Sequence, residues 1–80
     1  MNTDNKNFAK RNALNAEMAQ LMSNLSANTS DIGDWKVIKC YEARIQELPD
    51  PYDFDELMAA RQAARDRINA IQKELKKLDK

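Results

Sequence analysis

Apolar side chains recur at helical spacing through the last third of the chain, which contains neither glycine nor proline after residue 51. Two interleaved series repeat every seven residues: Leu57, Ala64, Ile71 and Leu78, and Phe54, Arg61, Ile68 and Leu75. Together they form one seam along a helix, a pattern typical of helix-on-helix packing and of coiled coils. The spacing predicts a helix over residues 54–78, with Arg61 as the one charged member of its apolar seam.

The residues before this helix supply its start signal. Pro49-Asp50-Pro51 ends any preceding helix, because proline lacks an amide donor and clashes with the preceding turn. Asp53 can cap the amide of Glu56 while Glu56 reaches back to the amide of Asp53, an aspartate version of the capping box. Tyr52 and Leu57 occupy the two positions of a hydrophobic staple. We therefore expect the helix to begin one residue after Asp53.

A second amphipathic pattern occupies the first third of the chain. Its apolar residues step by four, three and four: Leu14, Met18, Leu21 and Leu25. This spacing predicts a helix over residues 5–26. The polar residues 26–30, all turn or cap formers apart from one alanine, form the connector that follows it.

The stretch between these two helices has two interpretations. Val37–Tyr41 contains β-branched and aromatic residues and can be read as a strand. As part of a helix over residues 31–48, it places these side chains on one face: Val37, Ile38, Tyr41, Ile45 and Leu48. The helix is favoured, because no other segment resembles a partner strand and a lone strand leaves its backbone groups unpaired. Ser30 or Thr29 would cap this helix, and Gly33 would let a neighbouring helix approach closely.

Three helices in 80 residues give an all-α fold class and a single small domain, residues 1–80. We expect either a three-helix arrangement or a long antiparallel helical hairpin with a shorter middle helix. The first half of the 54–78 helix would form the floor for the other two helices. Its second half, with more large apolar residues on the seam, is where we expect a partner to add.

Charge is balanced overall but unevenly distributed. Thirteen basic and 13 acidic residues cancel, yet residues 31–58 carry eight acidic and three basic side chains, and residues 59–80 carry three acidic and seven basic ones. The basic end supplies candidate phosphate contacts: Arg61, Arg65, Arg67, Lys73, Lys76 and Lys77. Acidic residues interrupt this set and aromatic residues are absent from it, so a solvated face is favoured over a nucleic-acid site.

The residue inventory argues against catalysis and against bound metal. The chain has no histidine, one glycine and one cysteine, which leaves no common general base, no glycine-rich phosphate loop and no thiolate cage. The acidic group at residues 50–56 lacks the glycine and the spacing of a calcium loop, and it suits helix capping better. We therefore expect no enzyme activity, no cofactor and no metal site, with Cys40 as a buried structural thiol.

Interaction with protein is the function that the apolar pattern favours. Candidate contact residues are two aromatic residues and the last members of the seam: Trp35, Tyr41, Ile68, Ile71, Leu75 and Leu78. Trp35 fits a core anchor and a recognition surface about equally well. We expect a non-enzymatic structural or protein-interaction domain that binds a partner or a second copy of itself. Two alternatives stay open. One is a nucleic-acid-associated accessory protein that uses the basic C-terminal face. The other is an inhibitor that binds a host protein by using its own acidic middle as a mimic of nucleic acid.

The compartment follows from the N-terminus and from a resemblance. The first seven residues lack the apolar core of a secretory signal, and no apolar run approaches the ~20 residues that span a bilayer. Ser30–Glu42, with Leu48–Asp53 and Arg61–Asp66, resembles short uncharacterised proteins encoded by bacteriophages and prophages of gut bacteria, a family with no established activity. The resemblance covers residues 28–75 and implies a bacterial or phage-infected cytoplasm.

Overall fold

The computed structural model describes residues 2–78, and the side chains of residues 6–78. Three helices make up the fold: α1 (Asn2–Ser26), α2 (Asp34–Ile45) and α3 (Phe54–Leu78). The described residues form no strand, which confirms the all-α prediction and makes the strand interpretation of Val37–Tyr41 wrong. None of the described helices combines the length and the apolar character needed to cross a membrane.

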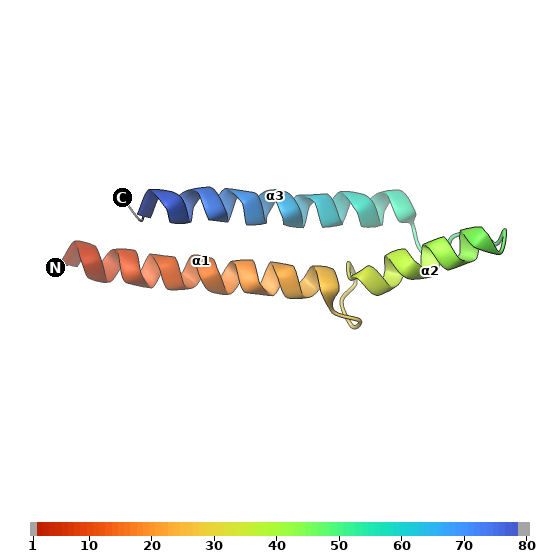
Figure 1. Cartoon of the computed structure of the whole chain (residues 1–80), viewed down its shortest axis with the longest axis horizontal. Coiled ribbons are helices and arrows are strands. Elements are labelled where there is room, and N and C mark those ends of the chain that lie inside the picture. Colours follow the sequence, from red (N-terminus) through yellow and green to blue (C-terminus); the bar gives the residue numbers. More distant parts are fainter. Residues whose placement is uncertain (1, 79–80) are drawn as a thin grey trace.

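The two long helices run antiparallel, side by side. The connection between them contains α2, which lies beyond the end of α1 and the start of α3 (Figure 1). The beginning of α1 and the end of α3 lie together at the opposite, open end of the hairpin (Figure 1). Because α2 continues the long axis instead of folding back over the hairpin, the molecule is a rod of 61 × 19 × 14 Å. Of the two predicted arrangements, the structure is the long hairpin with a shorter middle helix.

The core lies along the seam of α3, whose predicted bounds are confirmed. Its buried members are Leu57, Arg61, Ala64, Ile68 and Ile71, and α1 contributes the buried Leu14. The helix begins as expected, because the Asp53 carboxylate accepts a hydrogen bond of 3.0 Å from the amide of Glu56. Local signals were therefore sufficient to locate this helix and its first turn.

The second half of α3 is not left open for a partner. Contacts run along its whole length: Arg11 donates to the carbonyl oxygen of Leu78 near the open end, and Arg67 pairs with Glu17 midway. Ile68 and Ile71 are buried, since α1 covers the part of the seam that we expected to be available. The reason is length: α1 and α3 have 25 residues each, so each helix can cover the other from end to end.

The middle helix is three residues shorter at its start than predicted. Residues 30–33 form tight turns instead, in which Ser30 accepts hydrogen bonds from the amides of Ile32 (through its hydroxyl) and Gly33 (through its carbonyl). The N-cap is Gly33, with no side-chain cap, so the expected capping by Ser30 or Thr29 is wrong. Gly33 is needed for close approach: a Cβ there would lie 2.1 Å from the carbonyl oxygen of Ala27, just beyond the end of α1.

The same helix also ends three residues early, at Ile45. Glu47 adopts the left-handed conformation, with φ of 61°. The amide of Leu48 donates to the carbonyl of Ala43 (2.8 Å), and the amide of Glu47 donates to that of Arg44 (3.1 Å). This pair of bonds is a Schellman motif, which closes the helix before the prolines are reached.

Candidate interaction surface

Arg61 holds the junction at which all three helices meet. Its side chain is buried, and it donates hydrogen bonds to the carbonyl oxygens of Leu25 (3.1 Å) and Ile32 (2.7 Å) and to the carboxylate of Asp34 (2.6 Å). One guanidinium thus joins α3 to the last turn of α1, to the connector and to the first residue of α2. The pairing with Asp34 places Arg61 inside the chain, away from the exposed cations with which we grouped it.

Trp35 fastens the base of α2. Its indole Nε1 donates a hydrogen bond of 2.6 Å to the carbonyl oxygen of Ser30, and its ring meets the ring of Tyr52 edge-on, with centroids 5.6 Å apart. The ammonium of Lys36 lies 4.6 Å from the centroid of the Tyr52 ring, within the range of a cation–π contact. Trp35 is half-buried, so the structure gives it a packing role between α2 and the start of α3.

The far end of α2 is tied to the chain that returns toward α3. Arg44 donates two hydrogen bonds of 2.9 Å to the Asp50 carboxylate, and its guanidinium lies 4.1 Å from the centroid of the Phe54 ring. The hydrogen bonds from Arg44 hold the pKa of the Asp50 carboxyl below its ordinary value. Tyr41 packs against the same Phe54 ring, with centroids 5.9 Å apart. These contacts hold α2 in its extended position.

Large apolar side chains are exposed to solvent on one face of α2 and at Leu48, three residues beyond its end. We call this face the α2 stripe: Ile38, Tyr41, Ile45 and Leu48 are 54%, 52%, 82% and 55% exposed. The positions step by three, four and three, so the first three lie on one side of the helix. The opposite side carries Cys40, which is fully buried. The helix therefore carries apolar residues on both its inner and its outer face.

The expected contact residues are divided by the structure. Tyr41 is exposed and belongs to the α2 stripe, whereas Ile68 and Ile71 are buried between α1 and α3. Leu75 and Leu78 are half-buried on the same seam. Sequence reasoning recognised that Ile38, Ile45 and Leu48 share a face with Tyr41, but it gave that face no binding role. The sequence did contain a signal for its exposure. The two long helices have matched lengths and can cover each other, which leaves no helix to cover the outer face of the short middle one.

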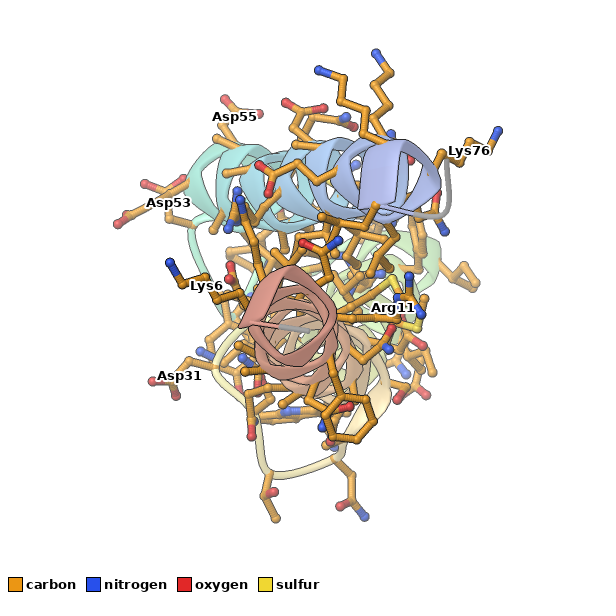
Figure 2. The ribbon with its side chains drawn as sticks, turned by 90° about the vertical axis from the view of Figure 1, so that its left-hand side faces the viewer. Lys6, Arg11, Asp31, Asp53, Asp55 and Lys76 are labelled. Carbon is orange, nitrogen blue, oxygen red and sulfur yellow. The ribbon has the colours of Figure 1, made fainter. Side chains whose placement is uncertain are left out.

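The candidate phosphate contacts are divided as well. Arg67 makes a bidentate pair with Glu17, at 2.5 and 2.9 Å, which lowers the pKa of Glu17 and raises that of Arg67. Four other cations of the set are exposed on α3 and take part in none of the ion pairs described: Arg65, Lys73, Lys76 and Lys77. Lys76 points outward from the hairpin in Figure 2. With Arg61 and Arg67 engaged within the chain, the basic surface is smaller than the sequence suggested.

A groove of about 450 Å³ lies between the base of α2 and the start of α3. Ile32, Leu57 and Ala60 contribute apolar lining, and Lys36 extends along it toward Tyr52. Asp31 and Asp53 stand on the same side of the molecule in Figure 2 and bring carboxylates to this groove. Lys36 lies 3.9 Å from Asp31, so a cation of the chain itself already meets the acidic edge.

The described residues define an antiparallel helical hairpin that carries a short helix beyond its closed end, and the α2 stripe holds four of their six exposed large apolar side chains. Comparison of the chain with protein-family models, with curated proteins and with solved structures gives no match.

Proposed function

We propose that the chain is a non-enzymatic protein-interaction domain in which the α1–α3 hairpin is a stalk and the α2 stripe binds a partner protein. The observation that carries the proposal is the exposure of four large apolar side chains, each more than half exposed, within eleven residues. Contiguous exposed apolar surface on a small protein marks interaction sites, because leaving it in water is unfavourable.

The energetics support binding through this face. Full burial of a side chain of this size stabilises by about 1.5–3 kcal/mol, and the residues of the α2 stripe have more than half of that still to gain. Tyr41 is the kind of residue that dominates interfaces, since it combines a large rigid ring with a polar end. The resemblance of residues 28–75 to phage-encoded proteins supports a partner in the bacterial cytoplasm.

A photo-crosslinking amino acid placed on the stripe tests the proposal. We expect Ile45→p-benzoylphenylalanine to give a discrete adduct with another protein in cells that contain the chain, and Ile38→Ser on the same chain to remove the adduct. Phe8→p-benzoylphenylalanine is the matched control, because Phe8 is 66% exposed on α1 at the other end of the rod. Absence of an adduct at position 45, or the same adducts from both positions, would contradict the proposal.

A further inference from the structure

We propose that the occupant of the α2 stripe is a basic amphipathic helix of another protein. This inference rests on the proposed function and adds the chemistry of the partner to it. Three observations carry it: the geometry of the stripe, the charge of the end of the molecule that bears it, and the poor fit of a second copy of the chain.

The geometry of the stripe matches a helix. Ile38, Tyr41 and Ile45 step by three and four, the spacing of one seam of a helix pair, and the seven steps of 1.5 Å between the first and the last span about 10 Å. A partner helix of about three turns would cover this length with residues at the same spacing. Because Tyr41 also packs on Phe54, the apolar surface continues from α2 toward the first turn of α3.

The segment that bears the stripe is acidic. Residues 31–58 carry eight carboxylates and three cations. Two of these cations are engaged inside the chain, Lys36 with Asp31 and Arg44 with Asp50, and Asp34 is paired with Arg61. Among the described residues, the members of this segment outside the ion pairs are Glu42, Glu47, Asp53, Asp55, Glu56 and Lys39. Asp53 and Asp55 point into solvent in Figure 2.

Five uncompensated carboxylates against one lysine set a negative potential at this end of the rod. Such a field attracts a cationic partner, speeds its encounter and disfavours an anionic one. Glu42 lies on α2 itself, beside the stripe, and Glu47 lies in the turn between Ile45 and Leu48, so both can face cations that flank the seam of a bound helix. Charge complementarity therefore selects lysine or arginine on the flanks of the partner.

A second copy of the chain fits less well in either orientation. Stripe-to-stripe pairing would bring together two segments of net charge −5 each, from eight acidic and three basic residues in residues 31–58. Pairing with the basic open end of another copy would relieve the charge, but there α1 and α3 already cover Ile68 and Ile71. Among the described residues, Phe8 is the one exposed large apolar side chain at that end, too little to cover the four residues of the stripe.

Binding of designed peptides to the full chain tests the inference. The probes are three fluorescein-labelled peptides of about 14 residues: a helix with a leucine seam and lysine flanks, the same helix with glutamate flanks, and a scrambled lysine peptide of identical composition. We expect fluorescence anisotropy to show that the lysine helix binds at least about tenfold more tightly than either control at low salt. The preference over the glutamate helix should shrink toward unity in about 1 M salt, where charges are screened within roughly 3 Å.

Variants of the chain assign the binding to its parts. Ile38→Ser/Ile45→Ser should weaken binding of the lysine helix at least about tenfold, the loss expected for removing two apolar contacts. Glu42→Gln/Glu47→Gln should weaken the lysine helix several-fold and leave the glutamate helix unchanged or tighter. Phe8→Ser is the matched control and should change nothing, and circular dichroism checks that each variant keeps its helices.

The outcomes separate this inference from the proposed function. Equal binding of the two helices, or equal binding of the scrambled lysine peptide, would overturn the basic amphipathic helix as the occupant. Sedimentation of the chain as a dimer that Ile38→Ser/Ile45→Ser dissociates would overturn it in favour of a second copy. After either peptide result, an adduct of position 45 with another protein would still stand and with it the proposed function. After the dimer result, the adduct would contain a second copy of the chain, and the stripe would be an interface between copies. Loss of the adduct removes both the inference and the proposed function.

Discussion

Arg61 occupies a position at which the seam of α3 otherwise carries apolar residues, and it is buried there with its charge satisfied by Asp34 and two carbonyl oxygens. The heptad spacing marked it as a seam member but did not identify the groups that satisfy its charge. The two carbonyl partners lie 29 and 36 residues away in the chain. No local pattern specifies contacts at such separations.

Removing the charge of Arg61 should loosen the junction. We expect Arg61→Met, which keeps most of the stem, to destabilise the protein by about 1.5–3 kcal/mol, the range for hydrogen bonds that involve a charged group. Urea unfolding followed by circular dichroism measures this change. Arg65→Met is the control, because Arg65 is exposed on the same helix and should shift stability by less than about 0.5 kcal/mol. Equal effects of the two substitutions would show that Arg61 does not hold the junction.

Glu47 adopts a backbone conformation that favours glycine, with φ of 61° at the end of α2. We expect Glu47→Gly to stabilise the protein by up to about 1 kcal/mol, because glycine avoids the Cβ crowding of the left-handed region. Thermal unfolding measures the effect. Glu42→Gly is the control and should cost about 1 kcal/mol, since it introduces the same residue inside the helix. A loss of stability from Glu47→Gly would mean that the Schellman motif does not limit α2.

At the scale of elements, the Glu17–Arg67 pair links α1 and α3 halfway along the hairpin. The pKa of Glu17 is lowered from its ordinary value of 4.5, mainly by the hydrogen bond from Arg67. A carboxyl whose folded pKa is depressed contributes stability above its unfolded pKa, and that contribution is lost as the pH falls through the folded pKa. The link between the helices therefore weakens below about pH 4.5.

Replacing this carboxyl should change the pH dependence of stability. We expect the stability difference between the natural chain and Glu17→Gln to be largest near neutral pH and to shrink as the pH falls below about 4.5. Denaturant unfolding at a series of pH values measures the difference. The double variant Glu17→Gln/Arg67→Gln should lose less stability than the sum of the losses of the two single variants, because each single substitution already removes the pair. A difference that stays constant with pH would contradict a role for ionised Glu17.

At the scale of the whole molecule, the exposure of the α2 stripe depends on α2 extending beyond the hairpin. The radius of gyration of the Cα atoms is 17.2 Å, whereas a compact chain of this length would have about 12 Å. We expect small-angle X-ray scattering of the monomer to give the larger value. A radius near the compact value would mean that α2 folds back over the hairpin and that the stripe is covered.

The position of α2 also depends on the Arg44–Asp50 pair, which ties α2 to the chain that returns toward α3. Asp50→Asn should release this contact and leave the hairpin of α1 and α3 intact. We expect the helical content to change little and any change in scattering to be confined to the α2 end. Loss of the whole helical signal in this variant would show that the hairpin depends on α2, contrary to the contacts along its seam.

Sequence alone determined the helical class, the bounds of α3 and the cap at Asp53, because these depend on residues three, four or seven apart. It did not determine where α2 begins and ends, because Gly33 at its start and Glu47 after its end act through turns that propensity does not reveal. Only the tertiary structure decided which apolar face stays in water: Ile71 and Ile45 are both isoleucines on amphipathic helices, fully buried and 82% exposed respectively. The physical reason is that burial is a property of what lies opposite a side chain, and that neighbour is fixed by the end-to-end pairing of α1 with α3, which leaves α2 uncovered.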